Sequence, residues 1–281
     1  MKSIQELLST ASGTEGSLLI QKTIYSTLVK AVNKKLIPRE LAARYIGPEE
    51  IKGSTIDIDL ETPDSFTTPL VAEGAAFPTL QDMFTSVNVR PLKYGVRPTF
   101  SRELMEDGKF SMVDVHINRA GQEIAENETG LIISALDGAA NTVAGGTQVT
   151  TANWNTAFNN LEKNDFKATD ILAGPDVIQD IRNTDIFTEA NKYGSDEMQR
   201  TGFVGKLLGC NLYEVSQSSG LMTTTTAYVI DREQAYAIAE KRPLSVDNYD
   251  DKTRDLTGLV VSQRVAVALL RSAAVCKITS S

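Results

Sequence analysis

Cysteine and histidine are nearly absent from this sequence, which has two cysteines and one histidine in 281 residues. Cys210 and Cys276 form no CxxC pair, so the sequence predicts neither a zinc site nor a disulfide framework. The single histidine, His116, falls in a predicted long helix and has no second histidine with which to bind a metal. A Ser/His/Asp or Cys/His arrangement is therefore not credible. We expect a protein that is not an enzyme and that uses no cofactor or metal.

Long hydrophobic runs are also missing. The richest segment, 256–274, is interrupted by Arg264 and Arg271, whereas a membrane-spanning helix needs about 18 or more apolar residues. The N-terminus lacks the apolar core and cleavage site of a secretory signal. Hydrophobic residues make up 41% of the chain, which is enough for one large or two modest domains. We expect a globular protein without a membrane partner.

Motifs for phosphate or calcium binding are incomplete. The segment 202–207 lacks the first glycine of a Walker loop and the Ser or Thr after its lysine. Acidic clusters at 103–107 and 247–251 do not have the spacing of an EF-hand. We interpret both clusters as solvated loops or as charge partners of a neighbouring subunit.

The charge that is present is unevenly distributed. The net charge of the chain is −8. Residues 1–45 carry seven basic and three acidic side chains, a balance of +4, so the remaining residues carry −12. A basic arm on an acidic body is suited to a polyanion on one side, because Lys and Arg gain from counterion release at phosphates. An ordinary solvated helix face explains the same residues equally well.

The first third of the chain predicts an amphipathic helix over 17–35 and then a hairpin. Segment 54–61 alternates apolar and acidic residues, as a half-solvated strand does, and apolar residues return at 84–89. Between them, 62–82 is rich in Pro, Gly, Thr and Ala and continues neither strand nor helix. A two-stranded ribbon is marginal by itself in water, so we expect it to pack on a neighbouring molecule.

The middle of the chain predicts a short helix over 101–108 and a long one over 111–137. The long helix has an apolar stripe at three- to four-residue spacing and would measure roughly 40 Å. Such a length is more than twice the average for globular proteins and indicates a structural spine.

A separate α/β region is predicted to follow the glycines near residue 146. It is expected to contain helices at 154–163, 176–182 and 232–240, and strands at 170–173, 211–215, 227–230, 258–270 and 273–278.

The order of these segments resembles that of the major capsid proteins of tailed bacteriophages and related archaeal viruses, which have the Hong Kong 97 fold. Three local sequences share the resemblance: VAEGAAFP at 71–78 resembles the tip of the family's extended loop, FSRELMED at 100–107 its short helix before the spine, and KLLGCNL at 206–212 the turn into a strand of its axial domain. The resemblance covers nearly the whole chain and implies an α+β fold.

The resemblance implies the following division of the chain. Residues 1–46 would be an N-terminal arm, 47–92 an extended loop hairpin, 93–145 a peripheral domain with the spine helix, 146–239 an axial domain, 240–271 the return strands of the peripheral domain, and 272–281 a final strand in the axial domain.

The implied function is that of a structural major capsid protein. It would self-assemble from hexamers and pentamers into an icosahedral virion capsid around double-stranded DNA. Assembly would take place in the host cytoplasm with a portal and a separate scaffolding protein, because the chain begins at Met1 without room for a cleaved scaffolding segment. Residues 53–92 contain no lysine, so the isopeptide bond found in some relatives is not expected.

The resemblance also implies which residues meet other molecules. Extended-loop contacts between subunits are assigned to Glu61, Asp64, Phe66, Glu73, Phe77 and Pro78. Peripheral-domain contacts are assigned to Arg102, Glu103 and Asp107. An arm facing DNA is assigned to Lys22, Lys30, Lys34, Lys35 and Arg39.

Two alternatives remain. An encapsulin-like nanocompartment has the same fold but encloses cargo protein, although its loop is usually shorter. A soluble oligomeric α/β enzyme or binding module would form a small discrete oligomer with a ligand pocket instead of a large particle.

Overall fold

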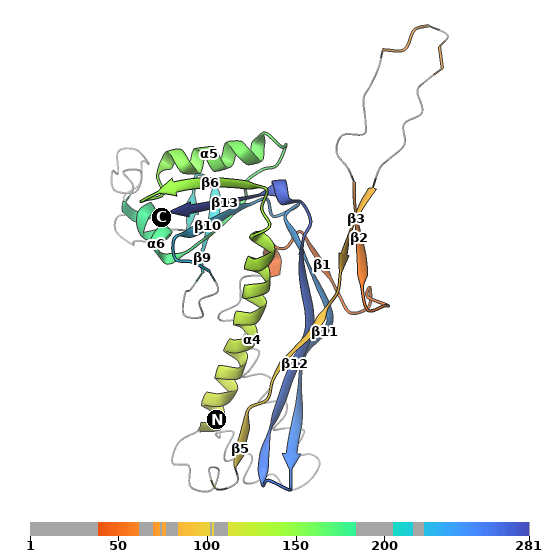
Figure 1. Cartoon of the computed structure of the whole chain (residues 1–281). Helices are drawn as coiled ribbons and strands as arrows, with labels where there is room; N and C mark the ends of the chain where they lie inside the picture. Colours follow the sequence, from red (N-terminus) through yellow and green to blue (C-terminus); the bar gives the residue numbers. More distant parts are fainter. Residues whose placement is uncertain are drawn as a thin grey trace.

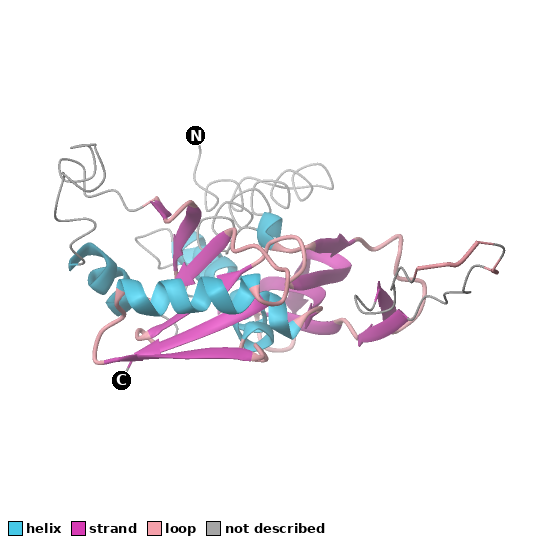
Figure 2. Cartoon of the chain, turned by 90° about the horizontal axis from the view of Figure 1, so that it is seen from above, coloured by secondary structure: helices cyan, strands magenta, loops and turns pink. Residues whose placement is uncertain are grey.

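A long central helix joins two β-sheets, and a two-stranded ribbon projects from one side (Figure 1). The structure is a computed structural model that describes residues 39–61, 70–73, 75–76, 84–101, 103, 112–183, 205–215 and 222–280. Seen from above, the ribbon lies at one end of the molecule and the helices of the six-stranded sheet lie at the other (Figure 2). The α+β class expected from the sequence is confirmed.

The five-stranded sheet is built on one long antiparallel hairpin. Its central strands are β11 (Tyr236–Asp251) and β12 (Leu256–Leu269). Strand β1 (Arg44–Ile46) pairs parallel with β11, while β4 (Leu92–Val96) and β5 (Thr99–Ser101) pair antiparallel with β12. The hairpin is thus flanked on both edges by short strands from the first half of the chain.

The predicted spine helix is confirmed as α4 (Met112–Leu136), which lies along the five-stranded sheet (Figure 1). Ile117, Ile124, Ile132 and Leu136 are all at most 4% exposed. They recur at the spacing that places side chains on one face of a helix, so this face forms the contact with the sheet.

The six-stranded sheet has the order β6-β13-β10-β7-β9-β8 and is covered on both faces. On one face, helices α5 (Thr151–Glu162) and α6 (Pro175–Asn183) pack against Ile171 and Val229. On the other face, Leu172 and Tyr228 pack with residues from the C-terminal half of α4. The strands are β6 (Asn141–Gly146), β7 (Asp170–Ala173), β8 (Lys206–Leu207), β9 (Cys210–Glu214), β10 (Thr226–Ile230) and β13 (Val275–Ser280).

The third sheet is the ribbon of β2 (Ile56–Glu61) and β3 (Phe84–Val89), which pair antiparallel from Ile56↔Val89 to Glu61↔Phe84. Both strands were predicted. Short 3-10 turns η1 (Arg39–Leu41) and η2 (Ser272–Ala274) complete the described elements. None of the described helices is long and apolar enough to cross a membrane.

One predicted helix is wrong. Residues 232–240 do not form a helix, because β11 begins at Tyr236. The run from Ala235 to Glu240 is rich in good helix formers, but every residue in it is buried and the strand pairs with β1 and β12 on its two sides. Burial on both faces in mid-sheet outweighed local helix propensity.

Two further helices and five strands predicted from the sequence are confirmed, while other predictions lie wholly or partly outside the described residues. The expected helices at 154–163 and 176–182 are confirmed by α5 and α6, and the five strands expected between 170 and 278 are confirmed by β7, β9, β10, β12 and β13. The helix expected at 17–35 lies outside the described residues. Of 101–108, the structure describes only Ser101, the last residue of β5, and Glu103, which is helical. The expected domain boundary after residue 145 falls inside β6, which pairs with β13 in the six-stranded sheet.

Candidate inter-subunit surfaces

The β2–β3 ribbon is held by only one of its faces. Ile58 and Val89 are 2% and 3% exposed and pack on Ala237 and Ala239 of β11, together with Ile46. Small alanine side chains let the ribbon come close to the sheet. Side chains alternate along a strand, so the acidic residues that alternate with the apolar residues of β2 face away from the sheet. These residues, Asp57, Asp59 and Glu61, are all exposed.

Two further contacts hold the base of the ribbon. Arg271 Nη2 donates a hydrogen bond of 2.9 Å to the Glu61 carbonyl, and Lys241 Nζ donates to the Gly53 carbonyl. These bonds and the apolar contact fix where the ribbon leaves the body. Beyond β2, none of the described residues 70–73 and 75–76 is buried.

Beyond Glu61 the described residues of the expected contact loop are exposed, except for Val71, which is half-buried. Leu70 is fully exposed at 101%, and Glu73 is exposed in a turn. Phe84, at the far end of β3, is 65% exposed. Covering exposed apolar side chains such as these with another surface lowers the free energy. The other loop residues assigned to contacts, Asp64, Phe66, Phe77 and Pro78, lie outside the described residues.

The first described residue, Arg39, lies in a cluster of buried charges. Its Nε and Nη2 donate hydrogen bonds of 2.7 and 2.8 Å to the two carboxylate oxygens of Glu128 in α4. Its Nη1 and Nη2 also reach the carboxylate of Glu240 in β11, at 3.2 Å each. Glu128 is fully buried and Glu240 is 3% exposed. One guanidinium therefore satisfies two buried carboxylates and ties the start of the described chain to both the helix and the sheet.

The cluster changes the titration of its members. Burial alone would lower the pKa of Arg39, but the hydrogen bonds and negative charges of Glu128 and Glu240 raise it above its ordinary value. Burial and a hydrogen bond to Glu240 raise the pKa of Tyr45 to about 12. Arg39 was assigned to a DNA-facing arm, but its positive charge is matched here by these carboxylates. Lys22, Lys30, Lys34 and Lys35 lie outside the described residues.

A second polar cluster joins the end of α4 to the six-stranded sheet. Asp137, which follows α4 directly, accepts a hydrogen bond of 2.6 Å from Tyr228 of β10 and one of 2.7 Å from Lys277 of β13. Burial alone would raise the pKa of Asp137, but these hydrogen bonds and the Lys277 charge hold it below its ordinary value. The cluster fixes the direction in which the helix leaves the sheet.

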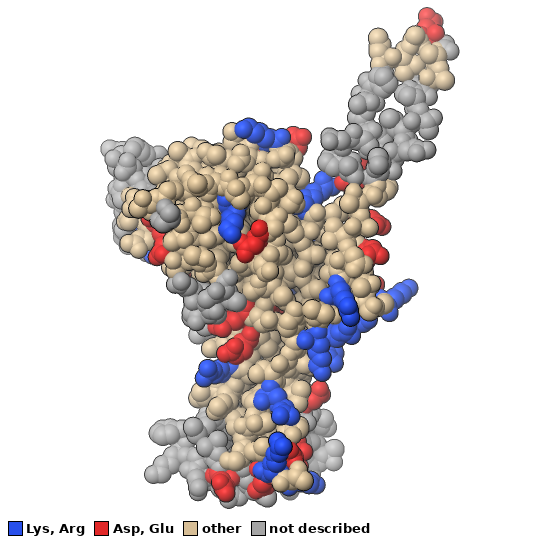
Figure 3. Space-filling view, viewed as in Figure 1, with Lys and Arg blue, Asp and Glu red and all other residues tan. Residues whose placement is uncertain are grey.

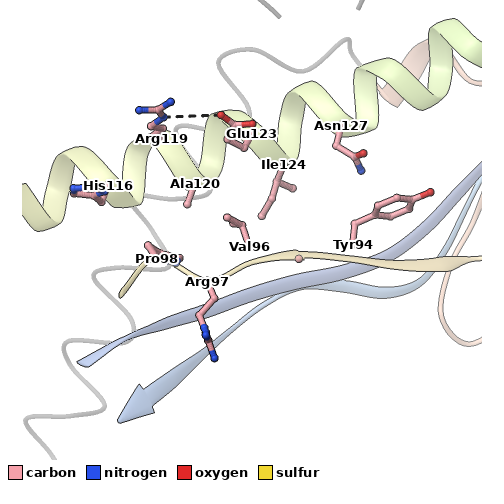
Figure 4. A pocket seen from close by; sticks show the side chains of 11 residues that line it. Tyr94, Val96, Arg97, Pro98, His116, Arg119, Ala120, Glu123, Ile124 and Asn127 are labelled. Atoms are coloured by element: carbon pink, nitrogen blue, oxygen red, sulfur yellow. Dashed lines mark ion pairs between the residues drawn. The ribbon is translucent and has the colours of Figure 1, made fainter. Parts of the chain in front are cut away.

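A groove of about 480 Å³ runs between α4 and β4 (Figure 4). Val96 and Tyr94 face the helix across it, and Arg97 points away to stack on Tyr249, 4.6 Å from the ring centroid. His116 lies at one end in edge contact with Phe100. Its remaining lining residues are Gly95, Pro98, Arg119, Ala120, Glu123, Ile124 and Asn127.

These surfaces offer little for chemistry. In the groove, Glu123 pairs with Arg119 at 3.9 Å, and His116 contacts a ring instead of a carboxylate or nucleophile. In the part of the chain that the structure describes, no group of three or more His, Cys, Asp or Glu residues is placed to hold a metal ion. Burial raises the pKa of Cys276 to about 11, which keeps its thiol protonated and unreactive at neutral pH.

Of the residues assigned to peripheral contacts, Glu103 is exposed, while Arg102 and Asp107 lie outside the described residues. Sequence reasoning missed the role of Glu128. A signal for it was present, because Glu128 stands four residues after Ile124 and four before Ile132, inside the buried stripe of α4. A lone carboxylate in such a stripe requires a buried cation as partner.

Solved structures with the same fold come from phages and from a virus-like particle. A chain from Mycobacterium phage Che8 matches with a TM-score of 0.69 and 14% identity, covering 87% of this chain and 91% of that one. The mature capsid of bacteriophage PhiM1 matches with a TM-score of 0.63 and 10% identity over 85% of each chain. A virus-like particle from Pyrococcus furiosus matches with a TM-score of 0.59 and 9% identity, covering 92% and 98%. A search of curated proteins gives no match.

The ribbon, the spine helix and the two sheets thus define a chain with the Hong Kong 97 fold. The sequence places it more closely: residues 16–280 match the phage capsid family, and the chain belongs to this family. It is a structural capsid protein and part of a virion shell, as the resemblance seen in the sequence implied.

Proposed function

We propose that this chain assembles from hexamers and pentamers into an icosahedral shell around double-stranded DNA, and that it does so without catalysis. The β2–β3 ribbon is the observation that carries the proposal. It buries one side chain per strand against its own body, and none of the described residues beyond it is buried. A chain of this shape gains most by laying the ribbon on a neighbouring copy, through Glu61, Glu73 and the loop residues between 62 and 82.

Particle size tests this proposal first. We expect the purified full chain to form closed particles tens of nanometres across, measured by light scattering and negative-stain electron microscopy. A small discrete oligomer as the only species would overturn the proposal and favour a soluble enzyme or binding module.

The contents of the shell are a separate part of the proposal. Four lysines of the arm, Lys22, Lys30, Lys34 and Lys35, are proposed to face the DNA, because cations near phosphates release counterions. Replacing all four with glutamine is expected to leave shells intact and to reduce the nuclease-protected DNA per particle. Unchanged DNA content would refute the role of the arm.

A shell that encloses protein is the second candidate, since this chain covers 98% of the subunit of the Pyrococcus furiosus virus-like particle. Particles from the native source that contain a cargo protein and no nucleic acid would favour it.

For the phage shell we propose assembly in the host cytoplasm with a portal and a separate scaffolding protein. We propose no isopeptide bonds, so boiled particles should run as monomers in a denaturing gel.

A further inference from the structure

Three positively charged side chains stand next to each other across the five-stranded sheet. In the register of the sheet, Arg242 of β11 lies opposite Arg264 of β12, and Arg264 lies opposite Lys93 of β4. Residues paired in this way project from the same face, with Cβ atoms about 5 Å apart, and like charges directly opposite each other destabilise a sheet. The described part of the chain provides none of the three with an ion-pair partner. We call these three residues the basic row.

The basic row exists because of an irregularity in β11. The pairing changes from Glu240↔Val265 to Arg242↔Arg264, so two steps on β11 match one step on β12. This β-bulge reverses the alternation of side chains. Glu240 therefore points toward α4, where it meets Arg39, and Arg242 points to the opposite face.

That opposite face is the one on which the ribbon base rests, since Ala266 and Ala268 of β12 also belong to the apolar cluster of Ile58 and Val89. Figure 3 shows Lys and Arg side chains gathered at the edge of the molecule below the ribbon and Asp and Glu side chains along the ribbon. Arg264 is partly held, because its Nη2 donates to the Pro91 carbonyl at 3.2 Å, and Lys93 is exposed. Arg242 is half-buried, and its Nη2 donates to Ser262 Oγ at 2.8 Å. Lys93 and the half-buried Arg264 are therefore the members of the basic row most open to a partner.

The ribbon carries the complementary charge. Asp57, Asp59 and Glu61 are exposed on one face of β2, opposite the uncharged residues Asn88, Ser86 and Phe84 of β3. Their side chains point away from the sheet on which their own ribbon rests, so they cannot reach the basic row of their own molecule. Three carboxylates at alternate positions span about 13 Å, and the basic row spans about 10 Å across three strands. Flexible Arg and Lys side chains accommodate this difference.

We propose that the basic row binds the acidic face of β2 from a second copy of the chain. This proposal rests on the proposed assembly and names the residues through which one copy recognises the next. The contact is heterologous, because the ribbon of one copy meets the sheet of another, and contacts of this kind generate rings. An acidic strand is favoured over nucleic acid as the occupant, because the same molecule displays matching carboxylates that have no ion-pair partner among the described residues, although Asp57 accepts a hydrogen bond from Asn88.

Exchange of charges tests the proposal. Variant A, Asp57→Lys/Asp59→Lys, makes the ribbon basic, and variant B, Lys93→Glu/Arg264→Glu, makes the row acidic. Each is expected to remain folded by circular dichroism and to need at least a tenfold higher protein concentration to form particles. The quadruple variant, which carries both changes, is expected to regain assembly. A mixture of A and B is expected to form even-membered rings such as hexamers where neither does alone, because A and B can then alternate around the ring with complementary contacts.

Matched controls separate this contact from a general effect of charge. Lys163→Glu/Lys167→Glu makes the same change in net charge as variant B at exposed positions beside the six-stranded sheet, and it is expected to assemble like the wild type. The proposal is overturned if A and B assemble normally, if the quadruple variant does not regain assembly, if the mixture forms no rings, or if the control loses assembly equally. Normal shells of B that contain less DNA would instead assign the row to nucleic acid. If the wild type itself forms no particles, the proposed function fails before any variant is made.

Discussion

The six-stranded sheet and the β2–β3 ribbon are both made of short strands, but they are stabilised in opposite ways. Strands β7 and β10 are buried along their whole length, with α5 and α6 on one face and α4 on the other. The ribbon buries Ile58 and Val89 and exposes most of its other side chains. The sheet needs nothing beyond its own chain, whereas the ribbon has a free face and exposed apolar residues beyond it. The difference indicates which part of the molecule folds for itself and which part is built for contact with other copies.

The largest expected effect is on assembly. Deleting residues 62–82 removes the segment between the two strands of the ribbon and leaves the five-stranded and six-stranded sheets intact. We expect a folded subunit whose thermal midpoint stays close to that of the wild type and which forms no particles in negative stain. Normal particles from this variant would show that the ribbon is not the connecting element.

The next largest effect is expected on stability, in the buried charge cluster of Arg39, Glu128 and Glu240. Arg39→Ala leaves the carboxylates of Glu128 and Glu240 buried without a cation, which costs roughly 3–5 kcal/mol in the free energy of unfolding. The control is Arg232→Ala, because Arg232 pairs with Glu40 at an exposed position, at 3.9 Å. Exposed pairs contribute about 1 kcal/mol or less. Urea titration of both variants should show this contrast, and equal losses would contradict it.

The two regions can also be compared by truncating one side chain in each. Ile171 in β7 is fully buried, and Ile171→Ala is expected to cost about 2–5 kcal/mol through lost burial and a residual cavity. Leu60 in β2 is only partly buried, so Leu60→Ala should cost about 1 kcal/mol or less in the isolated subunit. A larger loss for Leu60→Ala in urea titration would mean that the ribbon is more strongly stabilised by its own chain than its burial indicates.

The smallest effect concerns pH at the joint between α4 and the six-stranded sheet. The pKa of Asp137 is lowered from 3.8, so its ion pair stabilises the folded chain fully above that pH. The stabilisation is lost as the pH falls through the lower pKa of the folded state. Asp137→Asn should therefore be less stable than the wild type at pH 7, and the difference should shrink in acid below about 3.8. A difference that does not change with pH would exclude the ionised carboxylate as its cause.

Elements with a strong pattern of their own were predictable. The alternation at 54–61 and the stripe at 111–137 predicted β2 and α4, because each repeats over enough residues to be recognised. The short strands β1 and β4 were not predicted. Arg44–Ile46 has one buried residue and Leu92–Val96 has none, and both are strands only because they pair with the edges of the long hairpin.

The candidate contact surfaces were predictable in part. The acidic face of β2 can be seen in the sequence, since its period of two separates Asp57 and Asp59 from Ile58. The basic row cannot, because Lys93 and Arg264 are 171 positions apart and their meeting depends on the register of β4 with β12. The bulge that turns Arg242 onto the same face is equally invisible in the sequence.

By itself, the sequence determined the spine helix, the half-solvated ribbon and the kinship with capsid proteins, because these depend on periodic patterns and on the order of segments. Only the tertiary structure decided that 236–251 is a strand, that Arg39 lies between Glu128 and Glu240, and that three cations line up across one sheet. The physical reason is the same in each case. Pairing register and burial between distant segments choose among conformations that local propensity leaves nearly equal in free energy.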